Sequence, residues 1–252
     1  MDKMREYDVR SICSKINYKR NDRQTLMYSS TYTRRLRNLS NDVQSNARSI
    51  MVGIGIDGLE PNKDIRQLVE VVKESDKPAK LHDFLEKVVA AHGKVVRRFD
   101  FGRSLIFVNK KETRDYLVQE LGGRGWTVAP YDSGVFRDHP GCMDPIFRAM
   151  MDIEDDFRAG KYQILILTEA ASGITMPNIH YVINYDFPHN IEDYVCRIDH
   201  TRGPRGTSYS MITKDGCKCV GKLIEVLEAT GQERPRELYE LEIESRVRKN
   251  CM

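Results

Sequence analysis

The chain has 252 residues, of which 40% are hydrophobic and 31% are charged, the balance of a globular protein with a substantial core. The formal charge of +3 is small, so composition alone does not indicate nucleic acid as a partner. No run of 18 or more apolar residues is present and the N-terminus lacks the apolar stretch of a secretory signal. We therefore expect an intracellular protein, nuclear or cytoplasmic, with no membrane partner.

The six cysteines are scattered along the chain, and we expect free thiols because the protein is predicted to be intracellular. Cys217 and Cys219 form the only close pair in the sequence. They lack a second pair at the spacing of zinc ligands, so we predict no metal site.

The first part of the chain carries two helical and several strand-like patterns. Apolar residues recur at helical spacing in 2–16 and in 33–45, which predicts two amphipathic helices. The apolar residues 25–28 are predicted to form a short buried strand. Residues 50–56 form a β-rich run broken by glycines, and 65–72 are predicted to form a further strand.

From residue 77 onward, helical and strand patterns alternate. The predicted helices and strands are, in chain order, 79–92 (helix), 104–108 (strand), 111–122 (helix), 127–129 (strand), 145–158 (helix), 162–167 (strand), 181–184 (strand), 190–198 (helix), 208–212 (strand) and 216–229 (helix). Such alternation is typical of an α/β protein with a mostly parallel, twisted sheet. Ligands of such sheets bind beyond the carboxyl ends of the strands, so residues that follow strands are the candidate site residues.

Several of these segments resemble motifs of one family. Residues 168–174 (Thr-Glu-Ala-Ala-Ser-Gly-Ile), 182–188 (Val-Ile-Asn-Tyr-Asp-Phe-Pro) and 191–198 (Ile-Glu-Asp-Tyr-Val-Cys-Arg-Ile) follow each other in the order and spacing found in the second lobe of DEAD-box RNA helicases. Residues 23–31 resemble the strand and Ser-Ala-Thr motif that close the first lobe, most closely in nuclear members of the family. Residues 105–109 resemble the strand that opens the second lobe's motifs.

The resemblance implies a RecA-like fold of the P-loop NTPase type, in which helices flank a parallel sheet. It also implies four regions. These are a remnant of the first lobe (1–55), an interlobe linker (56–76), the helicase C-terminal RecA-like lobe (77–235) and a charged tail (236–252), which we expect to be a solvated helix or disordered.

The family uses ATP with Mg²⁺, but the residues that would hold the phosphates are missing from this sequence. A phosphate cradle has the pattern G-x-x-x-x-G-K-[ST], and neither this pattern nor Asp-Glu-Ala-Asp occurs. By the resemblance, Met1 corresponds to the middle of the first lobe. We therefore expect that this chain alone does not bind Mg²⁺-ATP productively or hydrolyse it.

The arginine motif of the family, H-R-x-G-R-x-x-R, is altered as well. Residues 196–203 read Cys-Arg-Ile-Asp-His-Thr-Arg-Gly. Arg197 is the residual arginine-finger position and a candidate nucleotide contact, whereas His200 replaces the second arginine. An alternative for Arg197 is a structural ion pair with Asp193 or Glu192.

The remaining site candidates also come from the resemblance. Thr168, Gly173 and Asn109 correspond to RNA-binding positions, although the loop lacks the family's arginine and its alternative interpretation is a strand exit without a ligand. Thr175 stands where an aspartate contacts the nucleotide ribose. Ser29 and Thr31 match the motif that couples the two lobes.

Three functions fit these observations. The leading one is a degenerate RNA helicase-like protein that binds RNA, another helicase lobe or a ribonucleoprotein component. The alternative is a fragment or incomplete gene model of an active ATP-dependent RNA helicase. A third is a protein partner that competes for a helicase's regulators without binding RNA.

Overall fold

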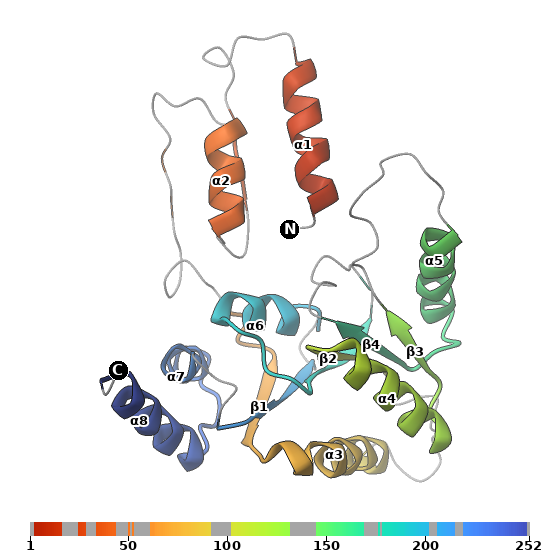
Figure 1. The fold of residues 1–252 in the computed structure, drawn as a ribbon, viewed down its shortest axis with the longest axis vertical. Coiled ribbons are helices and arrows are strands. Elements are labelled where there is room, and N and C mark those ends of the chain that lie inside the picture. Colours follow the sequence, from red (N-terminus) through yellow and green to blue (C-terminus); the bar gives the residue numbers. More distant parts are fainter. Residues whose placement is uncertain are drawn as a thin grey trace.

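A computed structural model describes residues 3–16, 25–28, 34–43, 50, 52, 61–91, 102–131, 145–168, 176, 178–201, 206–214 and 219–250. Its centre is a six-stranded sheet in the order β1-β6-β5-β2-β4-β3, and every pair of neighbouring strands is parallel (Figure 1). The strands are β1 (Arg66–Val71), β2 (Arg103–Val108), β3 (Val128–Tyr131), β4 (Ile164–Thr168), β5 (Ile179–Asn184) and β6 (Thr207–Ile212).

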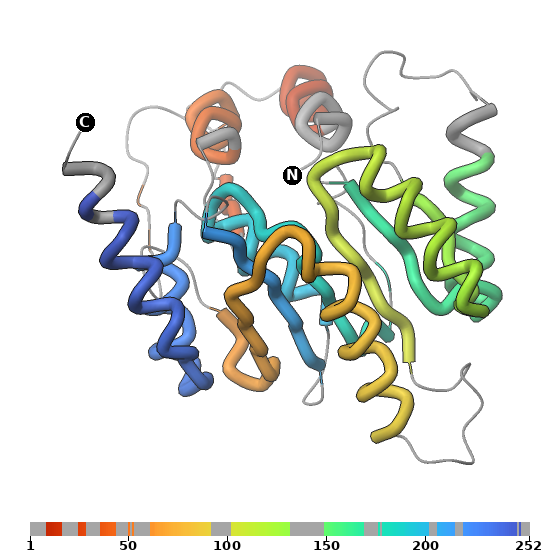
Figure 2. The backbone as a smooth tube through the Cα atoms, turned by 60° about the horizontal axis from the view of Figure 1, so that its bottom comes forward, coloured from red at the N-terminus to blue at the C-terminus, as the bar shows by residue number. Residues whose placement is uncertain are grey.

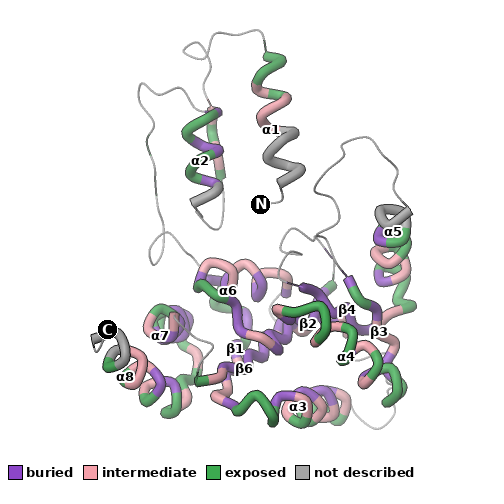
Figure 3. Tube along the Cα trace, viewed as in Figure 1, coloured by how far each residue is buried: buried purple, intermediate pink, exposed green. Residues whose placement is uncertain are grey.

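Helices cover both faces of this sheet (Figure 2). On one face, α3 (Lys77–Ala91) and α4 (Lys111–Gly123) pack against alternate residues of the central strands, such as Ile106 and Ile166. On the other face, α5 (Pro145–Arg158), α6 (Ile191–Ile198) and α7 (Val220–Ala229) pack against the intervening residues. The central strands are therefore buried on both faces, as their uninterrupted apolar sequences predict (Figure 3).

The elements predicted from residue 77 to the end of α7 are confirmed, with boundaries that differ by a few residues. The tail forms a helix, one of the two predicted alternatives, but the expectation that this helix is solvated is wrong for one of its faces. Residues 236–250 form helix α8 (Arg236–Asn250), and Leu238 and Leu241 on this helix are buried in the cluster that contains α6 and α7. The two leucines are three residues apart, which places them on the same face of the helix. This face of the tail therefore belongs to the core.

The connection predicted between the lobes contributes directly to the sheet. Strand β1 lies within residues 56–76 and pairs with β6 along its whole length, from Arg66 beside Thr207 to Val71 beside Ile212. A short 3-10 helix, η2 (Glu74–Asp76), then leads into α3.

Both predicted N-terminal helices are present, as α1 (Lys3–Lys15) and α2 (Arg34–Val43). Leu36, Leu39 and Val43 of α2 bury a small apolar cluster, against which Met27 packs. The predicted buried strand at 25–28 is wrong: these residues form no strand, and the side chain of Tyr28 is 90% exposed. An isolated apolar run needs a neighbouring strand to accept its backbone hydrogen bonds, and none of the described residues supplies one.

Among the described residues, Cys13, Cys196 and Cys219 are free cysteines. None of the helices in the described ranges combines the length and the apolar character needed to cross a bilayer.

Candidate functional site

The carboxyl ends of β2, β4 and β5 lie side by side, where a parallel α/β sheet binds its ligands. Val108 at the end of β2 is paired with Thr168 at the end of β4, and Phe107 is paired with Asn184 at the end of β5. The sheet order therefore brings together Asn109, Thr168 and the turn that follows Asn184, although these segments are far apart in the sequence.

Asp186, in the turn after β5, connects this whole edge. One carboxylate oxygen, Oδ1, accepts a hydrogen bond from Lys77 Nζ at 2.7 Å, and the other, Oδ2, accepts one from the backbone N–H of Asn109 at 2.8 Å. The backbone N–H of Asp186 donates to the carbonyl of Phe107 at 3.1 Å, and its own carbonyl accepts from Arg197. Asp186 thus joins α3, β2, β5 and α6.

Lys77 is a buried lysine, which is unusual because an ammonium group loses much hydration energy on burial. Two carboxylates compensate this loss: Asp186, and the exposed Glu74 at 2.9 Å. The ammonium also lies 5.4 Å from the centre of the Tyr185 ring. Burial raises the pKa of Tyr185, and the charge of Asp186 adds to this effect, so this phenol stays neutral and can face the cation.

Arg197 is turned into the protein. Its side chain is nearly inaccessible, since the residue is 2% exposed. Its Nη1 donates to the Asn184 side-chain oxygen at 3.2 Å and to the Asp186 carbonyl at 3.0 Å, and its guanidinium carbon lies 4.8 Å from the centre of the Phe107 ring. In this arrangement the guanidinium holds the end of α6 against the end of β5.

His200 lies two residues after the end of α6 and also contacts Phe107. The imidazole and phenyl ring centres are 6.0 Å apart with an angle of 25° between the rings. His200 is half-buried. The position that the family resemblance gives to a second arginine is thus occupied by a shorter aromatic ring that stacks on the strand.

Buried polar side chains continue from this edge towards β1. The amide nitrogen of Asn184 donates to Ser210 Oγ on β6 at 2.9 Å. Tyr194 on α6 donates its hydroxyl to Gln67 Oε1 on β1 at 2.9 Å, and Gln67 in turn donates to Thr230 Oγ1 at 3.1 Å. Each of these buried polar groups has a partner, as low-dielectric interiors require.

The predicted site residues fall into two groups. Arg197, His200, Asn109 and Thr168 come together around the ends of β2, β4 and β5. Thr175, Gly173, Ser29 and Thr31 lie outside the described residues. The resemblance missed the roles of Lys77 and Asp186, although Asp186 stands in one of the recognised motifs.

The described residues at this edge do not fit a Mg²⁺-phosphate site. The carboxylate of Asp186 is engaged by Lys77 and by the Asn109 amide, and the guanidinium of Arg197 faces inward. Within the described ranges, no group of three His, Cys, Asp or Glu side chains is placed to hold a metal ion.

Comparisons with known proteins agree with this architecture. A model of the helicase conserved C-terminal domain matches residues 76–202. The chain is 34% identical over 239 residues to ATP-dependent RNA helicase DBP2 of Chaetomium thermophilum, covering 94% of this chain and 39% of that helicase. It is 33% identical over 236 residues to DEAD-box ATP-dependent RNA helicase 20 of Arabidopsis thaliana, covering 91% of this chain and 42% of that helicase. The chain thus spans well under half the length of these relatives.

Among solved structures, that of S. cerevisiae Dbp5 bound to RNA and ADP BeF3 matches with a TM-score of 0.60 at 22% identity, over 84% of this chain and 50% of that one. This likeness shows the fold, a RecA-like α/β sheet. Because the family model spans α3 to α6 and the relatives match over more than nine-tenths of this chain, the chain belongs to the DEAD-box RNA helicase family and carries its C-terminal lobe.

Proposed function

We propose that this chain is a degenerate helicase-like module that binds RNA or a protein partner and does not hydrolyse ATP or unwind RNA by itself. The observation that carries the proposal is the state of the arginine motif. Arg197 is committed to Asn184 and Asp186 inside the protein, and His200 stacks on Phe107 where a second guanidinium would be needed. An arginine that reaches the transferred phosphoryl group contributes about 10³–10⁵ to its rate, so this loss alone would be severe.

RNA is the proposed ligand of the carboxyl edge. The relatives are named as RNA helicases, and the matched Dbp5 structure is bound to RNA. Asn109 and Thr168 lie at the carboxyl ends of the adjacent strands β2 and β4. Gly173 belongs, by sequence, to the segment that follows Thr168. We assign the proposed RNA contacts to these residues and the residual nucleotide contacts to Arg197 and Thr175, in a protein of the nucleus or cytoplasm.

The test is binding of a fluorescein-labelled oligouridylate, measured by anisotropy at several salt concentrations. We expect weak binding whose logarithm falls linearly with the logarithm of salt concentration, because phosphate contacts release counterions. We also expect no change on adding ATP or a non-hydrolysable analogue with Mg²⁺, and no phosphate release. RNA binding that strengthens at least tenfold with nucleotide would contradict the proposal.

A second candidate is the corresponding part of an active ATP-dependent helicase, with residues 1–55 as the end of its first lobe, 56–76 as the interlobe connection, and Ser29 and Thr31 coupling the lobes. The observation that supports this candidate is that the chain aligns with only 39% of DBP2. The measurement is ATP hydrolysis after this chain is fused behind the first lobe of that helicase. ATP turnover by the fusion well above that of the first lobe alone would support the second candidate, and a fusion no more active than the first lobe would contradict it.

A further inference from the structure

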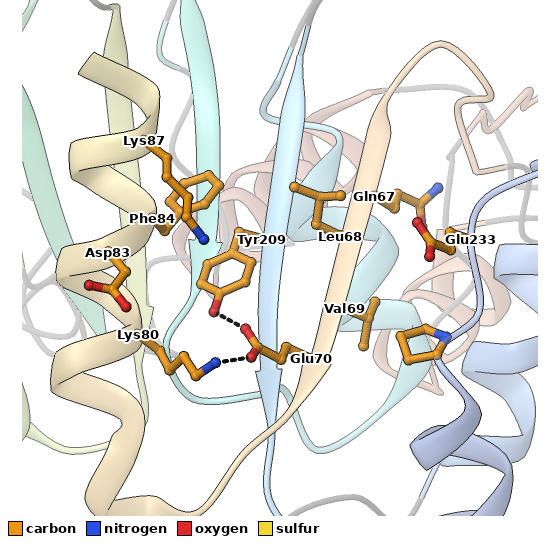
Figure 4. A pocket seen from close by; sticks show the side chains of 11 residues that line it. Gln67, Leu68, Val69, Glu70, Lys80, Asp83, Phe84, Lys87, Tyr209 and Glu233 are labelled. Carbon is orange, nitrogen blue, oxygen red and sulfur yellow. Dashed lines mark hydrogen bonds and ion pairs between the residues drawn. The ribbon is translucent and has the colours of Figure 1, made fainter. Parts of the chain in front are cut away.

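A groove opens on the face of the sheet that carries α3, at the end where β1 forms the edge (Figure 4). Its volume is ≈ 320 Å³. The lining side chains come from β1, α3, β6 and the segment between α7 and α8: Gln67, Leu68, Val69, Glu70, Lys80, Asp83, Phe84, Lys87, Tyr209, Glu233 and Pro235. None of the side chains that line the groove belongs to the cluster of Arg197, Asn184, Asp186 and Phe107.

The groove exists because two helices cannot cover six strands. Adjacent strands are about 4.8 Å apart and a helix is about 10 Å wide, so each helix covers about two strands. On this face α4 packs against β2, β3 and β4, and Phe84 of α3 packs against Tyr181 of β5 and Tyr209 of β6. Neither helix covers strand β1 on this face. Its residues Leu68 and Glu70, which lie two positions apart and so point to the same side of the sheet, are only half-buried.

The floor of the groove is partly apolar, and its side chains contact one another. The rings of Phe84 and Tyr209 stack with their centres 4.5 Å apart, beside Leu68. Tyr209 donates its hydroxyl to Glu70 Oε2 at 2.7 Å, and Lys80 pairs with the other oxygen of Glu70. Burial acts to raise the pKa of Glu70, but the hydrogen bonds from Lys80 and Tyr209 outweigh it and lower the pKa. Glu70 is therefore a fixed anion that holds Lys80 in place.

The side chains that line the groove carry a net charge of −1. The lining has three carboxylates and two ammonium groups, and one ammonium, that of Lys80, is already paired with Glu70. Among the described residues, Asp83 on α3 and Glu233 on the opposite wall have no ion-pair partner. Figure 4 shows these two carboxylates on either side of the Tyr209–Glu70 floor.

We propose that this groove binds an amphipathic helix of a partner protein, with apolar side chains on Leu68 and Tyr209 and basic residues beside Asp83 and Glu233. Such a helix would take the place of a third helix in the α3–α4 layer and bury the half-exposed face of β1. The charge of the rim selects basic flanking residues over acidic ones. This inference is independent of RNA binding at the carboxyl edge and would survive its failure.

The probe is a fluorescein-labelled, alanine-based peptide of about 15 residues, a length at which such helices begin to be stable. It has two leucines four residues apart and lysines around them. Two companion peptides replace the lysines by glutamates or the leucines by alanines. Binding to the full chain is measured by anisotropy at low salt. The test variant is Asp83→Lys/Glu233→Lys, and the matched control is Glu225→Lys, an exposed carboxylate on α7 outside the groove.

We expect the lysine–leucine peptide to bind at least tenfold more tightly than either companion. The double variant should lose this binding at least tenfold and gain affinity for the glutamate peptide, whereas Glu225→Lys should change neither. Because all three positions are exposed, the variants should remain folded, which circular dichroism verifies. Equal affinity for the three peptides would overturn the proposal, as would binding that the double variant leaves intact. Self-association of the chain that the double variant abolishes would indicate a second copy as the occupant and equally overturn it.

Discussion

Lys77 Nζ lies 2.7 Å from Asp186 Oδ1, although the two residues are 109 positions apart in the sequence. Their side chains are 5% and 13% exposed, so the pair is largely removed from water. The second oxygen of Asp186 binds the backbone N–H of Asn109, one of the proposed RNA contacts. The ion pair thus fixes the start of α3 and the end of β2 to the same carboxylate.

Replacing Lys77 by methionine should destabilise the protein by about 3 kcal/mol, because it leaves Asp186 buried without its cation. The double variant Lys77→Met/Asp186→Asn should recover part of this loss, since an amide can still accept the hydrogen bond from Asn109 without needing a counterion. Urea denaturation followed by circular dichroism measures both. A single variant as stable as the wild type would show that water reaches Asp186 and that the pair is not buried in solution.

Arg197 should behave as a structural residue. Arg197→Met removes the hydrogen bonds that the guanidinium donates to Asn184 Oδ1 and to the Asp186 carbonyl. Because both oxygens stay buried, we expect a loss of about 2–4 kcal/mol in the free energy of unfolding. His200→Ala removes a half-buried ring that stacks on Phe107 and should cost less than about 1 kcal/mol. Chemical denaturation of the two variants gives the comparison. A small effect at Arg197 together with a large one at His200 would contradict the geometry.

The sequence predicts the sheet far better than the site. Strands β2 and β4 are recognisable because every residue of 105–108 and 164–167 is apolar, which happens only when both faces are covered. The predicted strand at 25–28 is largely apolar too, but no described residue pairs with it, and pairing depends on residues elsewhere in the chain. Local patterns therefore identify which segments can be buried, but they do not identify which segments pair with a neighbouring strand.

The site was harder to predict because its contacts are long-range. The sequence predicts that Arg197 is either a nucleotide contact or an ion-pair partner of the nearby Asp193 or Glu192, which lie on the same helix. Its sequence neighbours give no hint of the hydrogen bonds that it makes to Asn184 at the end of β5 and to Asp186 in the turn after it. Lys77 looks like any lysine at the start of a helix, and nothing local indicates its burial.

The buried hydroxyl of Tyr194 makes stability depend on pH in the alkaline range. Burial raises the pKa of Tyr194, and it also raises those of Tyr185 and Tyr209. The folded state keeps these phenols neutral, whereas unfolded tyrosines ionise near pH 10. Their contribution is complete below about pH 10 and is lost as the pH rises towards the folded pKa values, because the unfolded state then releases protons first.

Tyr194→Phe tests this contribution. At pH 7 the variant should lose about 1–2 kcal/mol, because Gln67 Oε1 is left buried without the hydroxyl donor. Between pH 9 and 11 its stability should fall less steeply than that of the wild type. Urea midpoints across this range provide the measurement, and parallel curves for the two proteins would mean that Tyr194 is accessible enough to ionise normally.

Helix α8 should be part of the folding unit of the lobe. Leu238 is completely buried in the cluster formed with α6 and α7, so Leu238→Ala should cost about 3 kcal/mol, the usual effect of a cavity at a buried leucine. Ile243→Ala on the exposed side of the same helix is the matched control, because that side chain is 62% exposed and its loss should cost less than about 0.5 kcal/mol.

Truncation after Pro235 should remove Leu238 and Leu241 from the core and lower the urea midpoint by more than Leu238→Ala does. A truncated chain as stable as the full one would mean that α8 does not dock in solution, and that the lobe ends with α7.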